Sequence, residues 1–126
     1  MTEEEILALS KRFRVAFAKA DKDMFAEILT SDFEWHQHYG DKNDAPTGRV
    51  LQGIDALMEE LHWRRQNWSD VKFENMEERA AGDMILQTFV ISGTDPDGPF
   101  HAKAVDIYPI VDGRIARKDT YWKRFN

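Results

Sequence analysis

An aspartate near the C-terminus lies among small side chains, in a segment with the alternation of a β-strand. One face of this segment, between residues 100 and 111, would carry Ala102, Ala104, Asp106 and Tyr108. The two alanines leave room for a ligand, and a carboxyl group in an apolar pocket can transfer protons at neutral pH. Tyr108 can donate a hydrogen bond there or simply pack. The alternatives for Asp106 are an ion pair with Lys118 or with an arginine of a neighbouring strand, or a solvated position at the edge of the sheet.

A second group of functional side chains forms the segment from Trp35 to His38. Alternation divides it, because Trp35 and Gln37 share one face of a strand while Glu34, His36 and His38 share the other. A register shift of one residue would exchange the faces, so His38 is a candidate general base, and Trp35 and Gln37 are candidate ligand contacts. One carboxylate and two imidazoles can hold a metal ion, but no further ligand motif accompanies them, and we predict no metal.

Basic side chains gather at two further places. Trp63-Arg64-Arg65, close to Trp68, could stack on an aromatic ring or bind a carboxylate or phosphate, although such cations usually complement a helix dipole. The later basic residues alternate between faces, which predicts a solvated or dimer-facing strand; they are Arg114, Arg117, Lys118, Lys123 and Arg124. His101 is expected at the surface.

The composition limits the classes of protein and site. The chain has 126 residues, 42% of them hydrophobic, so we expect one domain with a packed core. It contains no cysteine, which excludes disulfides, thiolate catalysis and cysteine-bound metal centres. A net charge of −6 argues against nucleic acid as a partner, because a phosphate backbone is bound by clustered cations.

Membrane and export signals are not expected either. No run of apolar residues is long enough for a membrane helix, and the acidic start from Met1 to Glu5 lacks the basic region of a secretory signal. The sequence therefore predicts a cytoplasmic protein that does not bind membranes.

Helical periodicity predicts three helices in the N-terminal half. Thr2 and Glu5 have the spacing of a capping box and begin a helix over about residues 2–20. Asp21 can cap a second helix, which Thr30-Ser31-Asp32 interrupts. A short strand over 33–39 and a turn-rich segment over 40–48 follow. A third helix begins at Gly53 and should end near Asn67, with its apolar stripe on the sheet.

The second half has strand character. Four antiparallel strands are predicted at about 70–80, 84–94, 100–111 and 114–125, and the sharpest turn is at Asp112-Gly113. The order helix, helix, strand, helix and meander predicts an α+β fold. In this fold a curved, mixed or antiparallel sheet and three N-terminal helices would enclose a pocket.

This order, and above all the segment from Val105 to Trp122, resembles the nuclear-transport-factor-two-like superfamily over nearly the whole chain. The end of the helical hairpin at 29–33, Trp35 in its strand and Gly53 before the third helix also lie where this superfamily places such elements. The superfamily includes ketosteroid isomerases and SnoaL-like polyketide cyclases. The resemblance implies one cone-shaped domain over residues 1–126 that pairs with a second copy through its outer sheet face and needs no cofactor.

The resemblance also implies roles for single residues. Asp106 matches the protonated aspartate in the oxyanion hole of ketosteroid isomerases, and Trp122 matches an aromatic that lines the pocket. The catalytic base of those isomerases falls at Gln37, and their oxyanion tyrosine falls near Val15. Because both groups differ, steroid isomerisation is not expected.

Two hypotheses of function remain. The first is a cofactor-independent enzyme of SnoaL-like cyclase or isomerase type, in which Asp106 moves a proton at a carbon next to a carbonyl group. Its substrate would be a small apolar, aromatic or polyketide-like molecule. The second is a non-catalytic ligand-binding or dimeric accessory domain of the same fold. An epoxide hydrolase would need converging Asp, Arg and Asp side chains, which the predicted strands do not carry.

Overall fold

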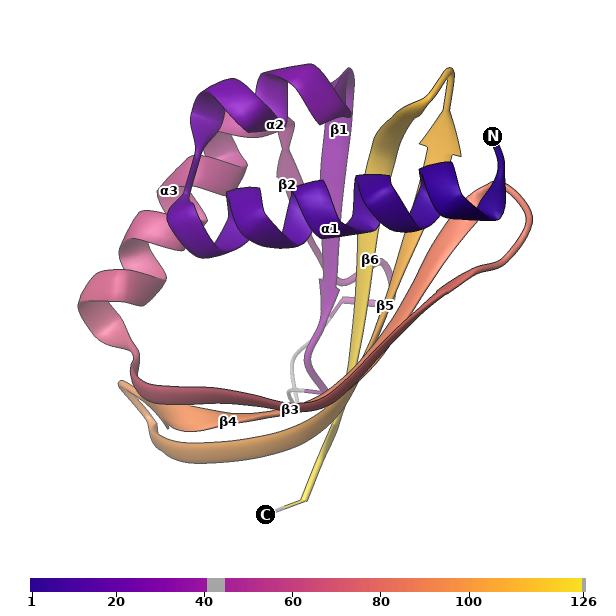
Figure 1. Cartoon of the computed structure of the whole chain (residues 1–126). Helices are drawn as coiled ribbons and strands as arrows, with labels where there is room; N and C mark the ends of the chain where they lie inside the picture. The colour runs from indigo at the N-terminus through magenta and orange to yellow at the C-terminus, as the bar shows by residue number, and fades with distance from the viewer. Residues whose placement is uncertain (41–44, 126) are drawn as a thin grey trace.

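The computed structural model describes residues 1–40 and 45–125, which form three helices and one sheet. The helices are α1 (Glu3–Lys19), α2 (Lys22–Ile28) and α3 (Gly53–Asn67). The strands are β1 (Leu29–His38), β2 (Arg49–Gln52), β3 (Ser69–Ala80), β4 (Met84–Asp95), β5 (Gly98–Val111) and β6 (Arg114–Arg124). All three helices lie on the same side of the curved sheet (Figure 1). The predicted α+β class is confirmed.

The six strands form one sheet in the order β2-β1-β6-β5-β4-β3. It is a mixed sheet, because β1 runs parallel to β6 while the other neighbours are antiparallel. The register of β3 against β4 shifts twice, and Asp70 and Asn75 in β3 both have a φ of 55°. Such bulges bend a strand, which accounts for the way β3 and β4 sweep round beneath the helices (Figure 1).

The predicted helix boundaries hold for α1 and α3. Thr2 and Glu5 form the capping box, with Thr2 Oγ1 accepting from the Glu5 amide at 3.1 Å and Glu5 Oε1 from the Thr2 amide at 2.8 Å. Asp21 caps α2 by accepting from the Met24 amide at 3.1 Å. On α3, Leu57 and Leu61 are buried, as the apolar stripe predicted.

Two predictions around β1 are wrong. The strand predicted over 33–39 begins earlier, at Leu29, so residues 30–32 follow the end of α2 at Ile28 but belong to β1. This strand pairs with β6 with a register shift between Leu29 and Glu34. The four-residue edge strand β2 is not predicted by the sequence; it pairs with β1. Of the turn-rich segment predicted over 40–48, positions 41–44 lie outside the described residues.

The four-strand meander is confirmed. The turn with the sharpest signal in the sequence lies at Asp112 and Gly113, whose φ angles of 51° and 77° are those of a hairpin turn between Val111 and Arg114. The apolar core divides into two clusters. One packs α1, α2 and α3 on the sheet, and the other lies under the far half of β4 and β5. Within the described residues, no helix is long and apolar enough to cross a membrane.

Candidate functional site

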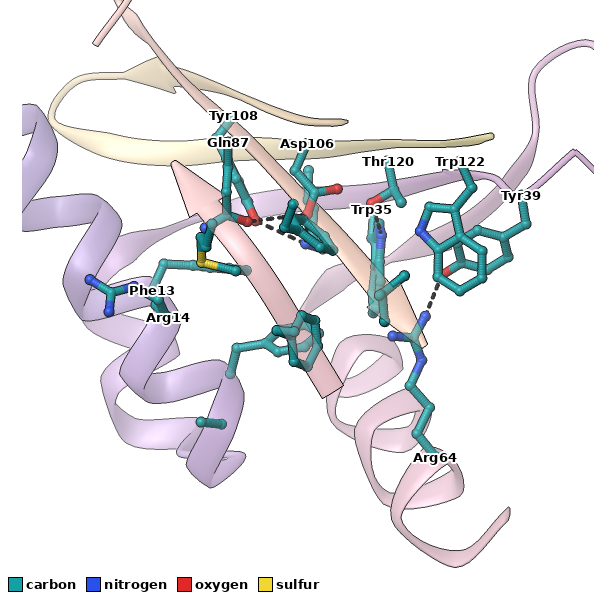
Figure 2. Close-up of a pocket in the computed structure, with 17 residues that line it drawn as sticks. Phe13, Arg14, Trp35, Tyr39, Arg64, Gln87, Asp106, Tyr108, Thr120 and Trp122 are labelled. Carbon is teal, nitrogen blue, oxygen red and sulfur yellow. Dashed lines mark hydrogen bonds and ion pairs between the residues drawn. The ribbon is translucent and has the colours of Figure 1, made fainter. Parts of the chain in front are cut away.

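A cavity of about 310 Å³ lies between the helices and the concave face of the sheet (Figure 2). Its walls come from both core clusters, for example from Phe13 on α1 and Phe89 on β4. Aromatic side chains make up much of the lining: Phe13, Phe17, Trp35, Tyr39, Phe73, Phe89, Tyr108 and Trp122. Such a space suits a small apolar or aromatic molecule.

Asp106 lies on the cavity wall and is 1% exposed. The predicted alternation is correct, because Ala102, Ala104 and Tyr108 are buried on the same face. Lys118 Nζ donates to Asp106 Oδ2 at 2.8 Å, so the ion pair that the sequence left as an alternative is present. Cavity and ion pair therefore coexist. The other carboxylate oxygen, Oδ1, is buried and has no hydrogen-bond partner among the described residues.

Lys118 reaches the cavity from β6, whose inward side also carries Thr120 and Trp122. Its ammonium group lies 4.9 Å from the Phe17 ring centroid and 5.3 Å from that of Trp35. Desolvation lowers the pKa of Lys118, which outweighs the opposite effect of Asp106. The result is an ammonium group with one anionic partner in a largely aromatic environment.

Tyr108 extends the polar group along the cavity wall. Its hydroxyl accepts from Lys118 Nζ at 2.9 Å and lies 3.2 Å from Gln87 Oε1, to which it can donate. Gln87 Nε2 in turn donates to Glu78 at 3.1 Å, and Arg14 pairs with Glu78 at the cavity edge. Burial, together with the charge of Asp106, raises the pKa of Tyr108, so its hydroxyl stays protonated and can act as a donor.

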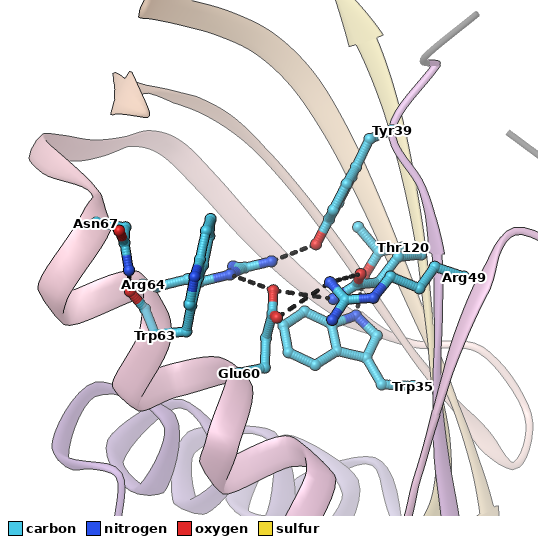
Figure 3. A network of polar contacts seen from close by, with 9 residues as sticks. Trp35, Tyr39, Arg49, Glu60, Trp63, Arg64, Asn67 and Thr120 are labelled. Atoms are coloured by element: carbon cyan, nitrogen blue, oxygen red, sulfur yellow. Dashed lines mark hydrogen bonds and ion pairs between the residues drawn. The ribbon is translucent and has the colours of Figure 1, made fainter. Parts of the chain in front are cut away.

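A second polar group lies on α3 (Figure 3). The Arg64 guanidinium lies 4.2 Å from the Trp68 ring centroid and 4.7 Å from that of Trp35. Its Nε donates to Glu60 at 3.1 Å, and Nη2 donates to the Tyr39 hydroxyl. Desolvation raises the pKa of Tyr39, so this hydroxyl also stays protonated.

Of the two registers considered for the segment from Trp35 to His38, the structure has the one in which Trp35 and Gln37 face inward and His38 faces outward. Trp35 lines the cavity, and its Nε1 donates to Thr120 Oγ1 at 2.9 Å. Gln37 is buried on the same side but lies beneath α3, where its Nε2 is 3.4 Å from Glu60. His38 faces the outer side and stacks on Tyr121, with ring centroids 4.6 Å apart. The structure therefore does not bring His38 to Asp106.

The remaining candidates are placed as follows. Trp122 and Tyr108 line the cavity with Asp106. Glu34 and His36 pair with each other at 3.1 Å, and in the described part of the chain no three His, Asp or Glu side chains form a group suited to a metal ion. Asp106 is the one carboxylate among the described residues that line the cavity, so the side chains for an epoxide hydrolase do not converge there.

Sequence reasoning considered Lys118 only as a partner of Asp106, and it left open whether Arg64 and Arg65 bind a ligand or complement the helix dipole. The alternation of Lys118, Thr120 and Trp122 was a usable signal, since Trp122 was already placed on the pocket side. Arg64 had no comparable signal, because its neighbour Arg65 is identical in type and instead donates to the Ala18 carbonyl oxygen at 2.9 Å.

The comparisons with known proteins agree with the fold described above. The family model described as a SnoaL-like domain matches residues 10–118. An NTF2-like protein from Burkholderia xenovorans LB400 superposes with a TM-score of 0.82 at 19% identity, over 98% of this chain and 92% of that chain. A protein of Xanthomonas campestris pv. campestris, provisionally described as a polyketide cyclase, gives 0.74 at 18% identity, over 96% and 92%.

A third similar structure contains a small molecule. This protein, from Catenulispora acidiphila DSM 44928, has a ketosteroid isomerase-like fold and was solved in complex with trimethylamine. It superposes with a TM-score of 0.67 at 13% identity, over 91% of this chain and 85% of that chain. No curated protein matches the sequence significantly.

Proposed function

The chain belongs to the SnoaL-like domain family, and on that premise we propose that it is a small-molecule enzyme of cyclase or isomerase type. In this proposal Asp106 takes a proton from a carbon next to a carbonyl group. The observation that supports it most is the Asp106 carboxylate itself, which is buried on the wall of an aromatic cavity with Oδ1 left without a partner among the described residues. That oxygen is the proposed proton acceptor.

Lys118 supports the proposed proton transfer by its charge. Before the transfer its ammonium group is paired with the Asp106 carboxylate at 2.8 Å. When Asp106 Oδ1 accepts the proton, the carboxyl group becomes neutral and the negative charge moves to the carbonyl oxygen of the substrate. Lys118 then faces this oxyanion, so one buried cation balances the charge on both sides of the reaction. The protonated Tyr108 hydroxyl is a second donor beside it.

This role differs from the one that the resemblance to ketosteroid isomerases implied. There the matching aspartate is a protonated donor in the oxyanion hole. Here Asp106 accepts a hydrogen bond from an ammonium group, which supports the role of a proton acceptor. The residue at the base position of those isomerases, Gln37, lies beneath α3 against Glu60.

Deuterium exchange tests the proposal without knowledge of the natural substrate. 2-Tetralone, an aromatic ketone with acidic protons next to its carbonyl group, is incubated with the protein in D2O, and proton loss is followed by NMR. We expect exchange above the buffer rate for the wild type and for D119N, whose aspartate pairs with Arg117 and does not line the cavity. D106N should fall to the buffer rate. Unchanged exchange in D106N would falsify the role of Asp106.

The Asp106–Lys118 pair also supports a second candidate function, a non-catalytic binding domain. An ion pair between 2% and 6% exposed side chains can serve to hold β5 and β6 in register. In that case ligands raise the melting temperature of wild type and D106N, but neither protein accelerates the exchange of ketone protons. Measurements of ketone exchange and of melting temperature on wild type and D106N therefore distinguish the two functions.

We also propose the setting in which this site works. The ligand would be a small apolar, aromatic or polyketide-like molecule, which the lining of the cavity supports, and no cofactor takes part. Two copies would pair through the outer face of the sheet, which the described helices leave uncovered (Figure 1). The cytoplasmic location stays a prediction.

A further inference from the structure

We infer that Arg64 binds a carboxylate, so that the ligand of this cavity is an aromatic or otherwise apolar acid. The inference deepens the proposed function and rests on it in one respect, since it takes the same molecule to reach Asp106. It starts from a cation that the proposed proton transfer does not use. Arg64 lines the cavity, and its side chain is only 11% exposed.

The position of Arg64 is fixed from several sides. Its guanidinium lies between the rings of Trp35 and Trp68, with centroids at 4.7 Å and 4.2 Å. Glu60 holds Nε from the preceding turn of α3, and the Tyr39 hydroxyl holds Nη2 (Figure 3). A planar cation held in this way presents its remaining N–H groups in a constant direction, which lowers the entropic cost of binding.

The charges around Arg64 do not cancel. Glu60, whose side chain is 5% exposed, pairs with Arg49 Nη1 and with Arg64 Nε, both at 3.1 Å. One carboxylate thus serves two guanidinium groups. The other two cations of the cavity wall each have a carboxylate partner, since Lys118 pairs with Asp106 and Arg14 pairs with Glu78, which lies behind the wall. The unbalanced positive charge of the described wall therefore lies at Arg64, in a protein with a net charge of −6.

A carboxylate is the anion that this group fits. A carboxylate is planar, like the guanidinium group, so the two can form parallel hydrogen bonds. In an aromatic acid the carboxylate is attached to a flat ring, and this ring can lie along the indole of Trp35. A phosphate dianion carries more charge and is tetrahedral, so one partly neutralised guanidinium satisfies it poorly.

Trp35 links the two polar groups of the cavity. Arg64 Cζ lies 4.7 Å and Lys118 Nζ lies 5.3 Å from the centroid of this one ring. A ligand lying along Trp35 can therefore contact both cations. Its carboxylate would be at Arg64, and the carbon that loses a proton would be at Asp106, which pairs with Lys118.

A pair of probes of equal shape tests the inference. 2-Naphthoate and its neutral analogue 2-naphthamide are titrated into wild type, R64M and R65M by calorimetry. We expect the wild type to bind the acid about tenfold or more tightly than the amide, as for a charge-assisted hydrogen bond that replaces a neutral one. R64M should lose this preference. R65M is the matched control, because Arg65 contacts the Ala18 carbonyl oxygen and does not line the cavity.

Three results would overturn the inference: equal affinity of the wild type for acid and amide, an equal loss in R64M and R65M, or tighter binding of 2-naphthyl phosphate than of 2-naphthoate. The first comparison needs no variant, so it decides even if R64M does not fold. Failure of the proposed function is separately visible. Acid preference without ketone exchange contradicts only the role of Asp106, whereas exchange without acid preference contradicts only the role of Arg64.

Discussion

At the scale of residues, the buried ion pair between Asp106 and Lys118 is a poor means of stabilising a small domain. Removing two charges from water costs about as much free energy as their attraction returns, and apolar residues of similar volume often serve equally well. Both side chains are nearly inaccessible, at 2% and 6% exposure, and both line a cavity. The position of this pair in the cavity wall therefore fits a chemical role better than a purely structural one.

The two buried tyrosines should make the protein less stable as the pH rises above 10. The pKa values of Tyr108 and Tyr39 are raised in the folded protein above the ordinary value of 10.0, so above pH 10 the unfolded chain loses protons that the folded chain keeps. The free energy of unfolding should fall as the pH rises, by about 1.4 kcal/mol per pH unit for each tyrosine. Urea unfolding of wild type and Y108F above pH 10.5 measures this, and Y108F should show the shallower decline.

The lowered pKa of Lys118 has the opposite effect on the free energy of unfolding, and it determines the pH range in which the tyrosines should be measured. Its folded pKa is lowered from 10.5, so between the lowered value and 10.5 stability rises with pH. Above 10.5 that contribution is complete and the tyrosines determine the slope. Equal slopes for Y108F and the wild type would contradict the prediction.

The sequence predicted part of the site, for reasons that differ between residues. Strand alternation placed Asp106 and Tyr108 together, and the resemblance added Trp122. Alternation left open whether Gln37 or His38 faces inward, because the register depends on pairing with β6. The inward direction of Arg64 could not be predicted, since it depends on contact with Trp35 of β1, which is far from it in sequence.

At the scale of elements, the sequence predicted those helix ends and turns that interactions between residues close in sequence determine. The capping box of Thr2 and Glu5 begins α1, and Asp112-Gly113 turns β5 into β6. The edge strand β2 has only four residues and forms through its pairing with β1. Its own sequence is therefore too short to show a strand pattern. The start of β1 at Leu29 was missed for the same reason, because it follows from pairing with Ile115 of β6.

Gly48, which precedes β2, allows a test of that strand. Its φ is +70°, and a Cβ there would lie 2.4 Å from the Gln37 carbonyl oxygen. Gly113 has a φ of +77° but nothing within 4 Å of a Cβ. Both alanine variants suffer the strain of a left-handed backbone, and G48A also displaces β1 from β2. Thermal and urea unfolding should show G48A less stable than G113A by about 1–3 kcal/mol. Equal losses would mean that the close approach is relieved at little cost.

At the scale of the whole molecule, the pattern of elements and the resemblance predicted the fold, but not the shape of its cavity. The order of helices and strands and the family match agree with the mixed six-stranded sheet. The curvature depends on bulges such as those at Asp70 and Asn75, which no simple residue pattern predicts. Cavity width follows from that curvature, and with it the choice of ligand.

The outer face of this sheet gives the last prediction, the proposed homodimer. A row of paired residues crosses four strands there, namely His38, Tyr121, Val105 and Thr88, and Tyr121 is 46% exposed. An aspartate at position 121 would place a charge in the middle of a packed interface, which is costly without a partner. Light scattering should therefore find twice the chain mass of 14.7 kDa for the wild type and a single chain for Y121D.

W63D is the matched control for Y121D, because Trp63 is an aromatic side chain of similar exposure, at 45%, that belongs to α3 on the opposite side of the sheet. This variant should keep the mass of the wild type. A wild type that runs as a single chain would remove the dimer from the proposal without contradicting the roles proposed for Asp106 and Arg64. Dissociation of W63D and Y121D alike would instead place the interface on another surface.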